Sequence, residues 1–214
     1  MNKRNFLFFI SVLTGLISSQ YIMAGNGDKP GKKAVSLKAD LQKSNIEWFA
    51  KKVTGEHNGT VKLSNGGLDI EAGKLKGGSF EIDMTSITVV DLTDADYNAK
   101  LTNHLKSDDF FSVEKNPKAA FKITKAAPIA HAKTGENNYT ITGDLTIKGI
   151  TNSLTFPAKV NISGSQADAT AKFDIDRTKY DVKFRSGKFF ENLGDKMIYD
   201  NFTIDLKLVA GDQI

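Results

Sequence analysis

The sequence predicts an all-β protein with about eight antiparallel strands and one short helix. Three observations support this fold class. Apolar and polar residues alternate along most of the chain after residue 42, which is the pattern of strands that are buried on one face and hydrated on the other. Turn-forming residues interrupt the alternation at short intervals. A single segment shows apolar residues at helical spacing together with good capping signals.

The first 24 residues have the features of a secretory signal peptide. Lys3 and Arg4 precede an apolar run from Phe6 to Ile17, and the small residue Ala24 offers a cleavage site. The run is shorter than the roughly 18 to 20 residues that span a bilayer, so it predicts a cleaved leader rather than a stable membrane anchor. We therefore expect export from the cytoplasm.

Composition limits what the mature chain can be. Removing residues 1–24 takes away two of the 29 basic residues and none of the 25 acidic ones, which leaves 27 against 25, a net charge of +2. This balance, without a basic block, argues against a nucleic-acid partner. The chain has no cysteine, so disulfides and lipidation at a cysteine are excluded. The Gly- and Lys-rich residues 25–41 predict a flexible lead-in, followed by one domain over residues 42–211.

The alternating segments predict most of the strands in order. They cover residues 46–53, 75–84, 119–124, 139–147, 154–162, 169–175 and 202–208. Two further short apolar stretches, 61–63 and 68–70, flank Asn65-Gly66-Gly67, which predicts a tight hairpin turn because such turns need positive φ. The pair Gly77-Gly78 inside a strand pattern predicts a bulge or bend.

The helical segment is expected near residues 94–106. Thr93 is a suitable N-cap, and one helix face carries the apolar or aromatic positions Tyr97, Leu101, His104 and Leu105. Such a helix could cover an open end of a barrel. Three carboxylates cluster at its start, and we interpret them as capping groups rather than a calcium site: Asp91, Asp94 and Asp96.

Half-buried strands need either closure into a barrel or a second sheet to cover their apolar faces, and the pattern leaves both open. The interior is also open to two interpretations, a packed core or a cavity for one small ligand. The residues expected to line such a ligand tunnel share the apolar parity of their strands. They are Ile46, Trp48, Val61, Leu63, Phe80, Ile82, Met84, Phe121, Ile141, Leu145, Phe156, Val160, Phe173, Ile175, Phe202, Ile204 and Leu206.

Three positively charged or titratable residues are candidates for contact with a polar head group. Lys52 shares its parity with Trp48, Arg177 shares its parity with Ile175, and His57 lies between two strands at the expected barrel rim. A cation at the mouth of an apolar cavity can hold an anionic group. A rim salt bridge is the alternative role for Lys52, and Phe49 on the opposite parity leaves the inward face of that strand ambiguous.

No catalytic or metal-binding constellation is evident. The three histidines, His57, His104 and His131, lie on separate predicted elements without metal-ligand spacing. The sequence lacks a Gly-x-Ser-x-Gly elbow and a glycine-rich phosphate loop. We expect no enzyme, no metal and no cofactor. An isomerase or hydrolase acting on a bound lipid, with His57 beside Lys51 and Lys52, is the distant alternative.

Several sequence blocks resemble the YceI family. They are IEWFAKKVTGEH at residues 46–57, GGSFEIDMTSI at 77–87, HLKSDDFF at 104–111, GDLTIKG at 143–149 and FDIDR at 173–177. The blocks occur in the family's order, and the similarity runs from about residue 43 to residue 209. The block at 104–111 is the most diagnostic.

The resemblance implies a single lipocalin-like antiparallel β-barrel that is located in the bacterial periplasm. In this family an apolar tunnel binds a polyisoprenoid chain, in some members a quinone-like or prenyl-diphosphate amphiphile, and no enzymatic activity is generally established. The resemblance therefore implies a carrier for an isoprenoid or quinone-like lipid. A barrel without a small ligand, acting as a stress-associated or protein-interaction module, is the second hypothesis.

Overall fold

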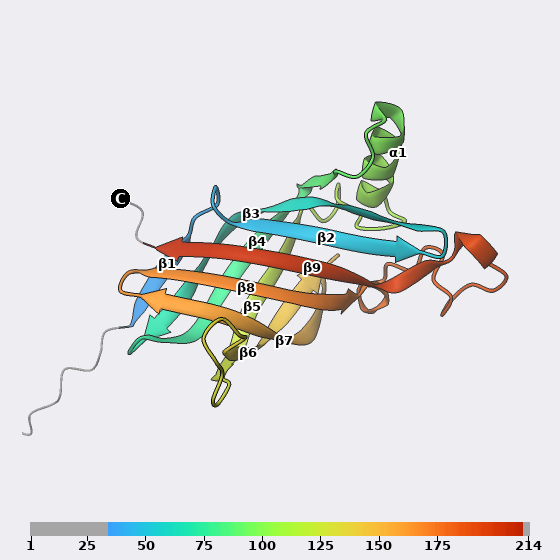
Figure 1. Cartoon of the computed structure of the whole chain (residues 1–214). Coiled ribbons are helices and arrows are strands. Elements are labelled where there is room, and N and C mark those ends of the chain that lie inside the picture. Colours follow the sequence, from blue (N-terminus) through green and yellow to red (C-terminus); the bar gives the residue numbers. More distant parts are fainter. Residues whose placement is uncertain (1–33, 212–214) are drawn as a thin grey trace, which may run out of the picture. The chain divides into compact units, whose positions relative to one another are not determined.

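The computed structural model describes residues 34–211, which form nine β-strands, one α-helix and two short 3₁₀ helices (Figure 1). The strands are β1 (Val35–Ala39), β2 (Asn45–Lys52), β3 (Gly55–Glu71), β4 (Lys74–Val89), β5 (Lys118–Pro128), β6 (Tyr139–Ile147), β7 (Ile150–Ser163), β8 (Gln166–Asp176) and β9 (Ile198–Gly211). The helices are α1 (Ala95–Lys106), η1 (Arg177–Tyr180) and η2 (Gly194–Lys196). The signal peptide expected at residues 1–24 lies outside the described residues.

All neighbouring strands pair antiparallel, and the sheet closes into a barrel of eight strand positions. From β2 to β9 each strand pairs with the next, and β9 returns to pair with β2. β1 and β2 share one position, because both lie between β3 and β9. β1 pairs with the far end of β3, at residues 67–70, and with the last residues of β9. The choice between a barrel and two sheets is therefore decided in favour of the barrel.

Strand β1 corrects the lead-in expected at residues 25–41. Leu37 and Ala39 are almost completely buried, and Val35 is paired with Ile70. The alternation of buried and exposed residues in β1 is short, and the segment from Asp40 to Ser44 separates β1 from β2. A strand of five residues gives too little periodicity to distinguish it from a linker. The domain begins at β1.

Strand β3 corrects the hairpin expected at residues 65–67. The strand runs through this segment, and Gly66 and Gly67 pair with Phe80 and Ser79 of β4. The register shifts between Leu63 and Asn65, so that Val61 and Leu63 point inward on one side of the shift and Leu68 and Ile70 on the other. The glycines are needed for close strand approach, since a Cβ at Gly67 would lie 2.7 Å from the carbonyl oxygen of Leu37. The change of parity marks a bulge, which bends the strand around the barrel.

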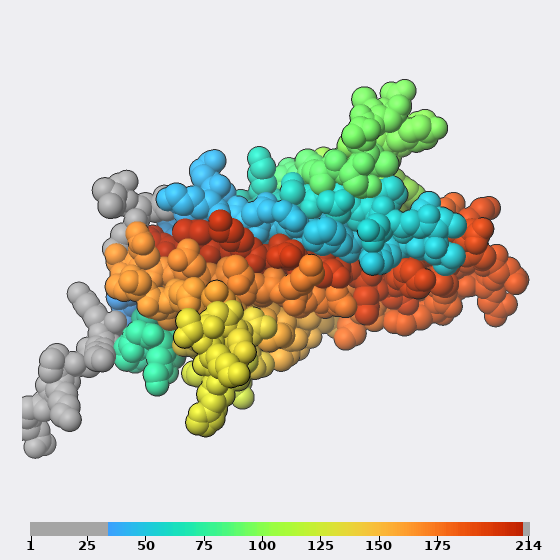
Figure 2. All heavy atoms as spheres, viewed as in Figure 1, coloured from blue at the N-terminus to red at the C-terminus, as the bar shows by residue number. Residues whose placement is uncertain are grey.

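Helix α1 begins one residue later than expected and does not cover the barrel end. Its N-cap is Asp94, whose carboxylate accepts hydrogen bonds from the backbone N–H groups of Asp96 and Tyr97. Only Leu105 is buried, and Tyr97 is 64% exposed. The helix therefore projects from the side of the barrel, as Figure 2 shows. Among the described residues, no helix is long and apolar enough to cross a membrane.

At Gly59 the neighbouring strand lies so close that any side chain would clash with it. A Cβ at Gly59 would overlap the carbonyl oxygen of Thr88 and lie 2.7 Å from Cζ2 of Trp48. We expect Gly59→Ala to lower the free energy of unfolding by about 2 kcal/mol or more, because neither a backbone carbonyl nor a packed indole can move away easily. Urea denaturation measures this loss. Gly55→Ala is the matched control on the same strand, since the nearest atom to a Cβ there is 4.0 Å away; equal losses for both variants would contradict the explanation.

Candidate functional site

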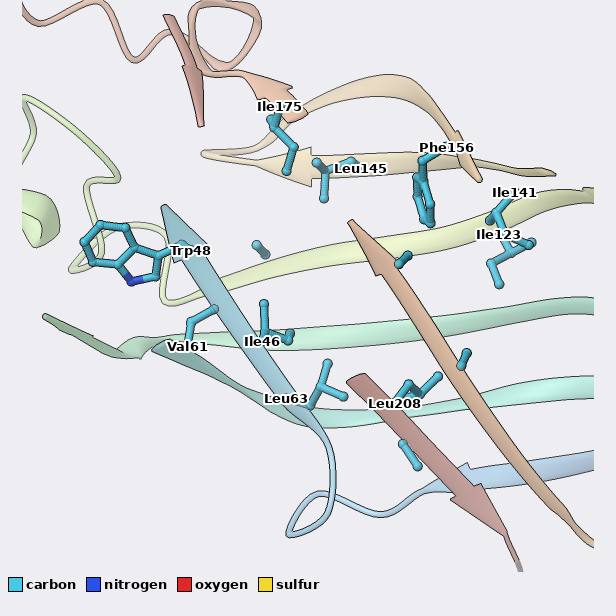
Figure 3. Close-up of a cluster of buried hydrophobic side chains, with 14 of the residues drawn as sticks. Ile46, Trp48, Val61, Leu63, Ile123, Ile141, Leu145, Phe156, Ile175 and Leu208 are labelled. Atoms are coloured by element: carbon cyan, nitrogen blue, oxygen red, sulfur yellow. The ribbon is translucent and has the colours of Figure 1, made fainter. Parts of the chain in front are cut away.

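The barrel encloses an apolar cavity of about 210 Å³. Its lining includes all seventeen residues that strand parity places in the interior, and every lining residue except Arg177 and Tyr199 is apolar. Figure 3 shows some of these side chains, with Phe156 beside Ile141 on the paired strand and Trp48 beside Val61. Contact of these residues with a ligand remains a prediction. The barrel is hollow, however, and not packed solid.

The cavity is long and narrow. Its lining on β9 runs from Ile198 to Leu208, which at about 3.3 Å per residue corresponds to about 33 Å of strand. Strands in closed barrels tilt by roughly 35 to 45° from the barrel axis, so this distance is about 25 Å along the axis. A cavity of small volume spread over such a length suits a slender chain rather than a compact molecule.

Aromatic rings shape the middle of the cavity. Phe156 and Phe173 stack with their ring centroids 4.0 Å apart, and Phe121 lies with its centroid 5.7 Å from that of Phe156. Trp48 places its indole in the lining, and its Nε1–H donates to the carbonyl oxygen of Thr88 at 3.1 Å. The hydrogen-bonding group of the tryptophan is therefore satisfied without a ligand, and the ring presents only carbon atoms to the cavity.

The two ends of the barrel differ. At the end formed by β1, the side chains of Leu37, Ala167 and Ala210 are each 1% exposed and lie outside the cavity lining, so this end is packed shut. At the end from which α1 projects, the lining is completed by Phe110, Phe111 and residues of the β8–β9 connection such as Val182. We call these two ends the β1 end and the α1 end. Irregular segments, rather than paired strands, close the cavity at the α1 end.

Arg177 was expected at the barrel mouth as a head-group contact, and the structure places it inside the α1 end at 4% exposure. Its Nε–H donates to the carbonyl oxygen of Tyr199 at 3.1 Å, Nη1 to that of Val182 at 2.8 Å and Nη2 to that of Ile198 at 3.0 Å. Burial lowers the pKa of Arg177, while the nearby carboxylates Asp200 and Asp176 act against this. Its donors are directed to the protein, and we infer a structural role.

Ion pairs surround Arg177 and connect β8, the β8–β9 connection and β9. Nη2 of Arg177 lies 3.6 Å from Oδ1 of Asp200, an oxygen that is buried without a hydrogen-bond partner among the described residues. Lys188 reaches Oδ2 of Asp200 at 3.4 Å and Asp176 at 2.9 Å. Burial raises the pKa of Asp176, but hydrogen bonds from Thr178 and Lys188 outweigh this, and the pKa lies below its ordinary value. The carboxylates thus hold the connection in place over the barrel end.

Truncating the buried cation tests its role. We expect Arg177→Met to lower the free energy of unfolding by about 3 to 5 kcal/mol, because three backbone carbonyls lose their donor and Asp200 loses one of its two cations. Lys179→Met, at an exposed position two residues away, should change it by less than about 0.5 kcal/mol. Denaturant titration of both variants provides the comparison. Unchanged stability of Arg177→Met, together with loss of a bound head group, would support the original head-group role instead.

His57 and Lys52 lie at the α1 end but outside the cavity lining. Nδ1 of His57 is 2.8 Å from Oδ2 of Asp91, whose Oδ1 accepts from the backbone N–H of Asn58 at 2.9 Å. Burial raises the pKa of Asp91, but these two hydrogen bonds outweigh it and the pKa lies below its ordinary value. Asp91 therefore joins the α1 connection to the β2–β3 hairpin and is not a helix cap.

Lys52 is exposed, and none of the ion pairs among the described residues involves it, so the rim salt bridge considered for Lys52 does not form there.

His104 lies in an aromatic cluster that joins α1 to the β8–β9 connection. Its ring is perpendicular to those of Phe110 and Phe184, with centroids 4.9 and 4.8 Å away, and Nε2 lies 2.9 Å from Oδ2 of Asp109. The described residues contain no cluster of three or more potential ligands placed to hold a metal ion.

Sequence reasoning missed the lining residues of the irregular segments. Phe110, Phe111 and Val182 belong to no strand, so no alternating pattern identifies them. Ile123, Ile147 and Leu208 also line the cavity, and these share the parity of neighbours that were identified. A full extension of the parity argument along each strand would have found them.

A closed antiparallel barrel around an apolar cavity of this length is the architecture of β-barrels whose interior has room for one small apolar ligand. The sequence profile of the YceI-like domain matches residues 37–210. The chain therefore belongs to the YceI family.

Relatives and solved structures agree with this assignment. The UPF0312 protein of Pseudomonas fluorescens strain SBW25 is 26% identical over 183 residues, covering 81% of this chain and 85% of the relative. A UPF0312 protein of Pseudomonas putida strain W619 is 31% identical over 107 residues, and this alignment spans half of each chain.

Among solved structures, the Burkholderia cenocepacia protein BcnA has a TM-score of 0.61 and 26% identity, over 80% of this chain and 99% of BcnA. A polyisoprenoid-binding domain from Saccharophagus degradans, implicated in plant cell wall breakdown, has a TM-score of 0.59 over 83% of this chain and 98% of that domain. Because the two sequences are only 15% identical, this structural similarity shows a shared fold alone.

Proposed function

We propose that this protein binds and carries a long, linear isoprenoid lipid in the barrel cavity, without catalysing a reaction. The observation that carries the proposal is the shape and chemistry of the cavity, which is about 25 Å long by the strand geometry and apolar except at Arg177 and Tyr199. Binding of an apolar chain there is driven by removal of its surface from water.

The isoprenoid class is supported by chemistry and by likeness. A branched unsaturated chain can pack against both the aliphatic residues and the stacked rings of Phe156 and Phe173. A solved structure of the same fold, from Saccharophagus degradans, is named as a polyisoprenoid-binding domain. Within this proposal a quinone-like head group or a prenyl phosphate would remain near the α1 end, because the β1 end is packed shut.

The periplasm is the proposed location. The support is the sequence of residues 1–24, with two basic residues before a short apolar run. A carrier outside the cytoplasm fits an aqueous compartment that a water-insoluble chain must cross.

Binding without catalysis is favoured over a lipid isomerase or hydrolase. His57, the candidate base, lies outside the lining and is paired with Asp91. The donors of Arg177 are directed to backbone carbonyls. His57 therefore lies away from a chain in the cavity, and Arg177, which lines the cavity, has its donors engaged by the protein.

A lipid co-purifying with the protein tests the proposal. Native mass spectrometry of protein purified without detergent from its host should show a bound prenyl lipid. Ala171→Phe should remove it, because Ala171 lines the cavity at 6% exposure and a ring there fills the tunnel. Thr170→Phe places the same ring at the adjacent exposed position and should retain the lipid. Failure to detect or load any quinone or polyprenyl phosphate would contradict the proposal.

A barrel without a small ligand, serving as a protein-interaction module, is the second candidate. The observation in its favour is the volume of about 210 Å³, which is below the roughly 300 to 1,000 Å³ of most ligand pockets.

Truncating an aromatic side chain that lines the cavity distinguishes the carrier function from the ligand-free one. If the barrel has no ligand, Phe156→Ala should only lower the free energy of unfolding, by about 3 to 5 kcal/mol. For a carrier, we expect a smaller loss, because Phe156 borders a cavity, together with faster release of the bound lipid. Parallel denaturation and lipid-release measurements distinguish these results.

A further inference from the structure

Exposed aromatic side chains gather at the α1 end of the barrel. Ten large hydrophobic residues are exposed in the described chain, and all four aromatic ones lie on elements of this end: Tyr97, Phe189, Phe190 and Tyr199. Phe189, Phe190 and Tyr199 are about half exposed, at 48, 50 and 49%. The β1 end carries only scattered aliphatic residues, namely Val35, Leu41 and Ile129. Exposed aromatics concentrated at one end indicate an interaction surface.

Three of these aromatics and one aliphatic residue belong to a single surface formed by the β8–β9 connection and the β2–β3 hairpin. The backbone N–H groups of Phe189 and Phe190 donate to the carbonyl oxygen of Ser186, in a turn whose Gly187 lies against Met197. The carbonyl oxygen of Met197 accepts from the N–H of Val53, which is 45% exposed. Tyr199 follows two residues later. We call Val53, Phe189, Phe190 and Tyr199 the aromatic rim.

Positive charge accompanies the aromatic rim. Within the β8–β9 connection, residues 177–197, Arg177 is buried and Lys188 pairs with Asp176 and Asp200. The other charged residues of this connection are exposed, four basic and three acidic, and the hairpin segment 51–56 adds two basic and one acidic residue. None of the ion pairs among the described residues involves Lys52, Arg185 or Lys196. The connection around α1, residues 90–117, has three basic and six acidic residues instead. Figures 1 and 2 show α1 projecting to the side, while the β8–β9 connection forms the end.

The rim is continuous with the cavity. Ile198 and Tyr199 line the cavity and are the first two residues of β9, which follows the β8–β9 connection. Val182, within the connection, also lines the cavity. A lipid leaving or entering the cavity at the α1 end would therefore pass beside the exposed rings. Aromatic residues with neighbouring lysines and arginines are the side chains that settle at the boundary between lipid head groups and acyl chains.

We propose that the aromatic rim docks on the surface of an anionic phospholipid bilayer, with Phe189 and Phe190 inserted among the lipids and Lys52, Arg185 and Lys196 facing the head-group phosphates. The inference rests on the proposed carrier function, because docking brings the α1 end of the cavity to the membrane from which a lipid is taken. Attachment is peripheral and reversible. It should weaken as salt concentration rises, since the cations are exposed.

Vesicle flotation tests the docking directly. Purified protein is mixed with vesicles of equal parts phosphatidylglycerol and phosphatidylcholine, or of phosphatidylcholine alone. We expect binding to the first and weaker binding to the second, and a reduction of about tenfold or more for Phe189→Ser combined with Phe190→Ser. Lys52→Glu combined with Lys196→Glu should reduce binding to the anionic vesicles only. Val35→Ser combined with Ile129→Ser is the matched control at the β1 end and should bind as the unmodified protein does.

Three results would overturn the docking surface. The first is that the unmodified protein does not bind vesicles, and the second is that the Phe189→Ser, Phe190→Ser variant binds them as well as the unmodified protein does. The third is a change in the oligomeric state of that variant, measured by light scattering, which would identify the rim as an interface between copies of the chain.

A loading assay keeps this proposal separate from the carrier function. The Phe189→Ser, Phe190→Ser variant should still take up a prenyl lipid from detergent micelles but load more slowly from vesicles. If the unmodified protein binds vesicles and takes up no lipid from either source, docking stands and the carrier function fails.

Discussion

Closure of the sheet is the constraint on which the rest of the structure depends. Once β9 pairs with β2 and β1, every strand of residues 34–211 is paired on both sides, and this part of the chain leaves no open sheet edge. Closure also fixes which side chains point inward, because successive residues of a strand alternate between the two faces. Ile46, Trp48 and Ala50 face the cavity for this reason, whereas Phe49 lies outside beneath the ammonium group of Lys172, 5.4 Å from its ring centroid. The cavity is thus a consequence of closure and of side chains too few or too small to fill the enclosed space.

Strand alternation was sufficient to predict the regular part of this structure. It identified the inward residues of β6, β7, β8 and β9, and the family resemblance added the closed barrel. It failed where the barrel must bend. At residues 64–67 of β3 and between Asp83 and Thr88 of β4 the inward parity changes, and a change of parity in sequence looks the same as the end of one strand and the start of another. Gly66 and Gly67 strengthened that error, because glycine serves both tight turns and close strand contacts.

Tertiary packing decides the features that the sequence could not predict. The helical pattern of residues 94–106 is real, but nothing in it determines whether the apolar face meets the barrel or solvent, and Tyr97 is largely exposed. Arg177 has the parity of an inward residue, and only the fold of the following connection shows that its donors meet three carbonyl groups. Likewise, Asp91 is close to helix α1 in sequence, yet its partner His57 comes from a hairpin 34 residues earlier.

The two barrel ends are closed by different kinds of contact. At the β1 end, small and aliphatic residues such as Leu37, Leu68 and Ala210 are nearly inaccessible and lie on paired strands, so opening there would break strand pairs and expose buried side chains. At the α1 end, closure depends on local hydrogen bonds, on ion pairs of Lys188 and on the contacts between His104 and Phe184. These contacts can separate without breaking any strand pair, and regions of this kind open at lower free energy than the core. A hollow barrel can therefore keep its fold while it admits a ligand, provided that entry occurs at the α1 end.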